Sequence, residues 1–166
     1  MLIYHPAYDA YHCIFRLLLI SEHINKVETD KIRLLDFYLV FPGSVANIKL
    51  PSELIGLRRE SKKLANIYRD PLSEVATFHE MKGIQDAALR SVVASGFFDL
   101  DSYSKGYVSR SLKPLPVGIE QRIENILEST GSVGLSAIIG LSQVPLLGKN
   151  GLKDRTHLME YRYDPA

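Results

Sequence analysis

Residues 83–110 read GIQDAALRSVVASGFFDLDSYSKGYVSR, and this stretch decides the fold expected for the chain. It begins as an amphipathic helix, reaches a stop at Ser95-Gly96, and continues as a short β-hairpin over residues 97–108. Ser104-Lys105-Gly106 supplies the glycine-containing turn of that hairpin. A helix followed directly by a two-stranded ribbon is typical of the second half of a winged helix-turn-helix.

Helices are expected on both sides of this stretch. Apolar residues at helical spacing predict a first helix over residues 8–24, with Tyr8, Tyr11, Phe15, Leu18 and Leu19 on one face. A helix over residues 52–68 has an expected apolar face of Leu54, Ile55, Leu57, Leu64 and Ile67. The remaining expected elements are helices at 31–40, 72–81, 83–95, 119–129 and 133–141, and a strand at 156–163.

The fold class expected from this order is mainly α with a small β component: a winged helix-turn-helix with extra helices. The length of 166 residues suits one hydrophobic core, so residues 1–166 are expected to form a single domain. Its winged-helix core spans approximately 8–112, and a C-terminal helical and strand extension covers 117–166. The role of the Gly-rich segment 131–151 is left open.

Composition narrows the class of protein. Hydrophobic residues make up 46% of the chain and charged residues 23%, which is ordinary for a globular domain. The formal net charge of +1 argues against affinity through broad phosphate neutralisation. Cys13 is the single cysteine and has apolar neighbours, so we expect it to be buried and inert.

The N-terminal residues predict a cytoplasmic protein. They carry no basic region and no small-residue cleavage site of the secretory type. The apolar run Leu17 to Ile20 falls far short of the roughly 20 residues that a membrane span needs. No membrane association is therefore expected.

No enzyme is visible in the motifs. Gly148-Lys149-Asn150 lacks the earlier glycine and the Ser or Thr of a phosphate-binding loop. His79-Glu80 lacks the second histidine that a zinc protease motif requires, because Gly83 occupies that position. We therefore expect no catalytic residues, no cofactor and no metal site.

A tyrosine-rich segment at the N-terminus leaves two readings open. Tyr4, Tyr8 and Tyr11, with His5, Asp9 and His12, could line a pocket and serve an enzyme. The favoured alternative is an aromatic face packed on another element, with its hydroxyl groups at the surface.

The helix over residues 83–95 makes a poor DNA reader. Contacts to base edges need Arg, Lys, Asn or Gln, and the segment offers Lys82, Gln85 and Arg90 among Ala, Val and Ser. Asp99 and Asp101 would repel phosphates near the hairpin. The balance favours docking to proteins, with any DNA contact weak and non-specific.

Two surfaces are the expected contact sites for a partner or for the DNA backbone. Helical spacing places four cations on one broad face, Arg58, Arg59, Lys62 and Lys63, although such a face can also be merely solvated. The hairpin contributes Tyr103, Lys105 and Tyr107, because exposed tyrosines give contact area at low entropic cost.

Three segments resemble a known family. They are Tyr8-Asp9-Ala10-Tyr11-His12-Cys13 with the following Phe15-Arg16-Leu17-Leu18, then Leu34-Leu35-Asp36-Phe37-Tyr38-Leu39-Val40-Phe41-Pro42, and the 95–107 hairpin. Together they resemble the middle-component subunits of bacterial three-component ABC-ATPase conflict systems, the group that includes Lamassu anti-phage systems. Phe37, Phe41 and Pro42 match the family's motif and are interpreted as core and turn.

The resemblance implies a small non-enzymatic adaptor or regulatory subunit. It would link an SMC/Rad50-like ABC ATPase to an effector subunit, often a nuclease, in an anti-phage defence complex. The alternative is a stand-alone winged-helix transcription regulator, which would need a homodimer and a base-reading helix.

Overall fold

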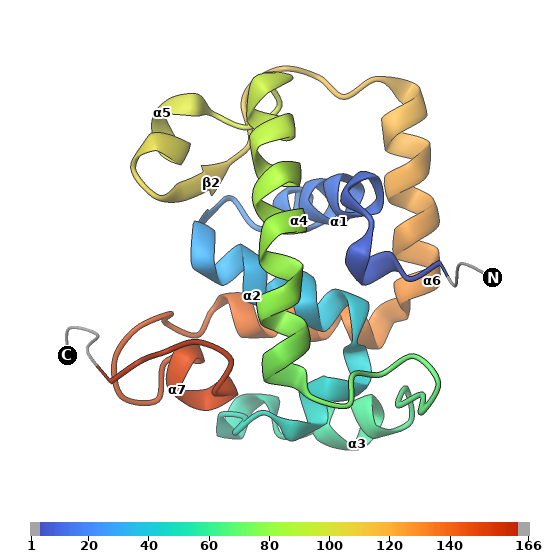
Figure 1. Ribbon diagram of the computed structural model, residues 1–166, viewed down its shortest axis with the longest axis vertical. Helices are drawn as coiled ribbons and strands as arrows, with labels where there is room; N and C mark the ends of the chain where they lie inside the picture. The colour runs from blue at the N-terminus through green and yellow to red at the C-terminus, as the bar shows by residue number, and fades with distance from the viewer. Residues whose placement is uncertain (1–3, 163–166) are drawn as a thin grey trace.

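The structure is a computed structural model that describes residues 4–162, and four long helices form its framework (Figure 1). These are α1 (Ala10–His23), α2 (Thr29–Val40), α4 (Glu74–Ala94) and α6 (Val117–Ser142). The shorter elements are η1 (Pro6–Tyr8), β1 (Lys26–Glu28), η2 (Pro42–Asn47), η3 (Ser52–Leu54), α3 (Leu57–Lys62), α5 (Leu100–Ser104), β2 (Tyr107–Ser109) and α7 (Leu152–Thr156).

Helix α2 lies at the centre, and every residue from Lys31 to Val40 is buried. A helix that is apolar on most of its faces is stable only inside a domain, and α1, α4 and α6 all contact α2. The helix ends at Phe41, before Pro42, because a proline disfavours helical geometry in the residue preceding it. The predicted helix at 31–40 is thus confirmed.

Helix α4 is continuous from Glu74 to Ala94 and begins at a Ser73 cap whose side chain accepts a hydrogen bond from the Ala76 amide. The helices predicted at 72–81 and 83–95 are therefore both helical, and the break predicted between them is wrong. A glycine inside a helix costs only about 1 kcal/mol, and a buried stripe that includes Met81, Gln85 and Leu89 carries the helix through Gly83.

The predicted β-hairpin at 97–108 is also wrong. Asp99 caps a helical turn, α5, by accepting a hydrogen bond from the Ser102 amide at 2.8 Å. Strand β2 pairs antiparallel with β1, with Val27 opposite Val108, and Phe98 adds a single bridge to Arg110. The chain from 4 to 162 is therefore mainly helical with a two-stranded antiparallel sheet, and a winged helix-turn-helix is not confirmed.

The helix predicted over 52–68 breaks into η3, α3 and a turn at residues 66–70. Asn66 and Asp70 close this turn by side-chain hydrogen bonds to the backbone, which compete with helical bonding. Ile67, predicted in the core, is consequently exposed.

The C-terminal part is mostly as expected from the sequence. The helices predicted at 119–129 and 133–141 both form, as the two arms of α6, and meet at a kink where Gly131 has φ 74° and ψ 172°. Residues 156–162 do not form the predicted strand; they contain the end of α7 and a turn at His157 with φ 57°. Tyr163, the last residue of that prediction, lies outside the described residues.

The five residues predicted to share one face of the first helix differ in burial. Phe15, Leu18 and Leu19 are buried, whereas Tyr8 and Tyr11 are exposed. Cys13 is fully buried, as predicted, and Phe37, Phe41 and Pro42 are buried as well. The expected core and turn roles of the last three residues are confirmed.

Candidate interaction surfaces

The four cations predicted to share one face do not all point the same way. Arg59, Lys62 and Lys63 are exposed, and Lys63 Nζ lies 2.9 Å from both Glu60 carboxylate oxygens. Arg58 instead turns inward and donates to the Ile48 carbonyl at 3.0 Å. Arg58 therefore holds α3 against the chain that follows η2, and the exposed basic surface has three members.

The turn after α3 exposes two large apolar side chains. Ile67 is 87% exposed and Tyr68 is 93% exposed, and we call this pair the tip. The turn is closed by hydrogen bonds at 2.7 Å from the Asn66 amide to Asp70 Oδ2 and from the Asp70 amide to the Asn66 carbonyl. The tip thus stands on an ordered turn.

Both flanks of the tip are anchored to the core. Ala65 lies so close to Gly43 in η2 that a Cβ on Gly43 would be 2.8 Å from the Ala65 Cα, so this approach requires glycine. On the other flank, His5 Nε2 donates to the Arg69 carbonyl at 3.2 Å. His5 Nδ1 accepts from the Ala7 amide, which leaves the ring proton on Nε2 for this bond.

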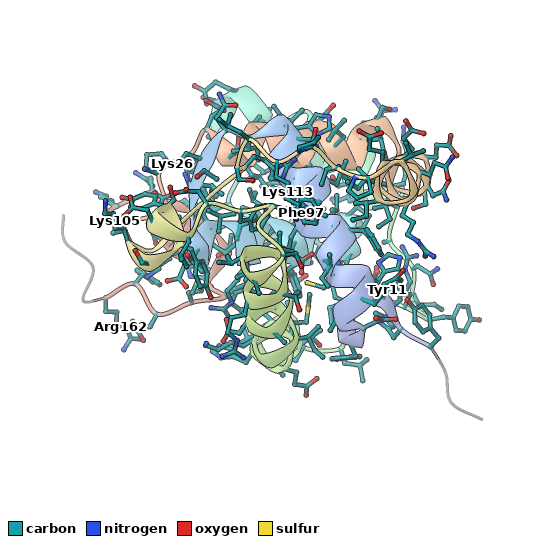
Figure 2. All side chains as sticks on the ribbon, turned by 90° about the horizontal axis from the view of Figure 1, so that it is seen from above. Tyr11, Lys26, Phe97, Lys105, Lys113 and Arg162 are labelled. Carbon is teal, nitrogen blue, oxygen red and sulfur yellow. The ribbon has the colours of Figure 1, made fainter. Side chains whose placement is uncertain are left out.

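The second predicted surface lies on α5 and β2. Tyr107 is 40% exposed, with Lys26 Nζ 4.8 Å from its ring centroid, and Lys105 Nζ pairs with Asp101 at 2.8 Å. Tyr103 is instead partly buried against the core. Lys26, which the sequence reasoning missed, lies on the same side of the molecule as Lys105 and away from Tyr11 (Figure 2).

The side chains that could have made α4 a reading helix are mostly engaged. Gln85 is fully buried, and its Nε2 donates to Asp36 Oδ2 at 2.9 Å and to the Arg33 carbonyl at 3.1 Å. Lys82 pairs with Asp86 at 2.7 Å. Within residues 4–162, Arg90 is the one of the three predicted donors that is exposed and unpaired.

A buried polar cluster joins α1, α2 and α4. The Arg16 guanidinium binds both Asp36 oxygens, with Nε 2.6 Å from Oδ1 and Nη2 3.2 Å from Oδ2. Burial alone would lower the pKa of Arg16, but the adjacent Asp36 carboxylate outweighs burial and raises it. Burial, followed by the Asp36 charge, raises the pKa of Cys13, so the thiol stays protonated and unreactive.

This cluster fixes the crossing of three helices and does not face solvent, so its role is positional. The sequence reasoning missed it. Its signal was one charge inside each of two apolar runs, Arg16 in Phe15-Arg16-Leu17 and Asp36 in Leu35-Asp36-Phe37. Buried charges are nearly always paired, so two opposite charges inside apolar helices predict an ion pair between them.

The tyrosine-rich segment fits each of its two readings in part. Tyr4, Tyr11 and His12 line a pocket of about 220 Å³ with Arg122, whose guanidinium stacks 5.1 Å from the Tyr11 ring centroid. Tyr8 instead donates to Glu80 on α4 at 2.8 Å. In the part of the chain that the structure describes, no group of three or more His, Cys, Asp or Glu side chains is placed to hold a metal ion.

Residues 2–164 match the family described as ABC-three component (ABC-3C) system Middle Component 5. The chain belongs to this family. It is thus a middle component of an ABC three-component defence system, which implies an ATPase and other partners. The resemblance to ABC-3C middle components is confirmed at this level. No curated protein and no solved structure matches the chain.

In this middle component the two predicted surfaces are far apart. Helix α3 lies at the lower end of the molecule, whereas α5 and β2 lie at the upper left (Figure 1). The fold does not bring the basic surface and the α5–β2 surface together into one site. Over residues 4–162, no helix has the length and apolar character needed to pass through a bilayer.

Proposed function

We propose that this middle component is a non-enzymatic adaptor that links an SMC/Rad50-like ABC ATPase to an effector subunit, often a nuclease, in a Lamassu-type anti-phage system. Membership of the ABC-3C family supports the setting of this proposal. The observation that carries the adaptor role is the burial of Gln85, because it removes one of the three candidate base-reading side chains from the surface of α4.

The burial of Gln85 favours the adaptor over the alternative function, a stand-alone transcription regulator. Reading bases in the major groove requires several long donors on one exposed helix face. Lys82 is held by Asp86, which leaves Arg90 on α4 for this purpose. Any DNA contact is therefore weak, non-specific and made to phosphates.

We further propose that the domain is derived from a winged helix. The order α1, β1, α2, α4, β2 and the antiparallel pairing of β1 with β2 support this derivation. In this proposal α5 occupies the place of the first arm of the wing. The derived fold then displays a helical turn where DNA-binding relatives would display a ribbon.

Two separated surfaces fit an adaptor, since it must hold two partners at once. We assign partner contacts to Arg59, Lys62 and Lys63 on one surface and to Lys105 and Tyr107 on the other. Arg58 supports the first surface through its hydrogen bond to the Ile48 carbonyl, and Tyr103 supports the second by packing against the core. Helix α3 and the α5–β2 segment lie at different ends of the molecule (Figure 1), which supports the binding of two partners at once.

Pairwise binding tests this proposal. The chain is co-expressed with the ABC ATPase of its system, and separately with the third component, and each mixture is treated with nuclease, purified and measured by native mass spectrometry. We expect a complex of fixed stoichiometry in both mixtures. A chain that stays alone in both, together with a footprint of the chain on its own promoter, would favour the transcription regulator.

A further inference from the structure

We infer that the tip, Ile67 and Tyr68, together with the basic surface of α3, docks into a protein partner at an apolar pocket rimmed by carboxylates. This inference rests on the adaptor function proposed above and adds the chemistry of one of its two partners.

The two side chains of the tip are almost fully exposed to solvent. Large apolar side chains that are almost fully exposed gain nothing from folding, and clustered exposed apolar surface marks sites of interaction. Leu72, two residues after the turn, is also fully exposed. Isoleucine and tyrosine are of a size that fills a partner's pocket.

The backbone of the tip is already held in place before a partner binds. The Asn66–Asp70 hydrogen bonds close the turn, the Gly43–Ala65 contact fixes its entry, and His5 holds its exit at Arg69. A side chain presented on a fixed backbone loses less entropy on binding than one on a free loop. The turn therefore suits a docking element.

The segment that contains α3 and the tip has an excess of positive charge. Residues 58–70 contain five cations and two carboxylates, whereas carboxylates outnumber cations in the rest of the chain. Glu60 is engaged by Lys63, and Asp70 by the Asn66 amide. In the described part of the chain, neither Arg59 nor Lys62 has a hydrogen-bond or ion-pair partner. A complementary rim on the partner is consequently acidic.

The apolar side chains of the tip favour a protein partner over DNA. Phosphates would satisfy Arg59 and Lys62 but would leave the aliphatic Ile67 in water, because a duplex backbone offers no apolar pocket. An apolar pocket with an acidic rim satisfies both the cations and the tip.

The experiment measures the dissociation constant of the full chain with the purified ABC ATPase and with the purified third component. The test variant is the double substitution Ile67→Ser, Tyr68→Ser, and its matched control is Leu112→Ser, since Leu112 is fully exposed outside this segment. A second variant, Arg59→Glu with Lys62→Glu, has the exposed Lys149→Glu as its control.

We expect the tip variant to weaken binding to one of the two proteins at least about tenfold, while binding to the other and both controls stay within about twofold. The charge-reversal variant weakens the same complex and flattens its salt dependence. The melting temperature of the tip variant stays close to that of the parent, because the replaced side chains are exposed.

Unchanged affinity of the tip variant for both proteins would overturn the inference and leave the adaptor function standing. Absence of binding by the parent chain to either protein would overturn the adaptor function itself. Loss of binding by the tip variant to a DNA duplex or to anionic phosphatidylserine vesicles, with protein binding intact, would also contradict the inference.

Discussion

The Asp36 carboxylate is fully buried and accepts hydrogen bonds from Arg16 and Gln85. Asp36→Ala leaves the Arg16 charge buried without its counter-ion, which typically costs about 3–5 kcal/mol. We expect a loss of that size in the free energy of unfolding, measured with urea. Glu60→Ala breaks the exposed pair with Lys63 and should cost less than about 1 kcal/mol. Equal losses in the two variants would contradict a positional role for Asp36.

His12 gives the same cluster a pH dependence. Arg16 Nη1 lies 3.1 Å from His12 Nδ1, and an arginine can only donate, so Nδ1 accepts and the neutral ring carries its proton on Nε2. Burial first, and then the Arg16 charge, lower the pKa of His12. The unfolded chain therefore takes up this proton at a higher pH than the folded chain does.

It follows that the stability contributed by neutral His12 is present above the unfolded pKa of about 6.5 and is lost as the pH falls below it. We expect the free energy of unfolding to decrease between about pH 7 and about pH 5.5. His12→Gln keeps an acceptor for Arg16 and should show a smaller decrease in urea titrations at the two pH values. Identical decreases would show that other groups carry the pH dependence.

At the scale of elements, two glycines of the long helices have opposite roles. Gly83 lies in the interior of α4, and nothing would touch a Cβ there within 4 Å. Gly83→Ala should therefore stabilise the protein by about 0.5–1 kcal/mol. Gly131 holds the kink of α6 in a backbone region that essentially only glycine occupies.

Gly131→Ala should accordingly destabilise the protein by about 1–3 kcal/mol. Thermal and urea unfolding of the two variants measure whether each substitution raises or lowers the free energy of unfolding. If Gly83→Ala were the destabilising change, the continuous α4 would be wrong and the break expected from the sequence would be restored.

The elements that could be predicted are those whose signal is local. The helix at 31–40 and both arms of α6 follow from apolar spacing and from Pro42, which stops the first of them. The pairing of strand β2 could not be predicted, because its partner β1 lies about 80 residues earlier in the chain. The 97–108 segment alternates like a hairpin, yet the Asp99 cap makes part of it helical.

At the scale of the whole molecule, the spacing of the charged residues was enough to predict that three of the four cations at 58–63 are exposed. Arg59, Lys62 and Lys63 are exposed as expected, since long cations rarely lie in a core. The tip could not be predicted, because Ile67 at helical spacing reads as a core residue. Only the turn closed by Asn66 and Asp70 turns it outward.

In the adaptor function proposed above, this middle component bridges two other proteins. The most direct measurement is the association of the ABC ATPase with the third component, by analytical ultracentrifugation, in the presence and absence of this chain. We expect a ternary complex with the chain and no association without it. Equal association in both samples would contradict the adaptor role.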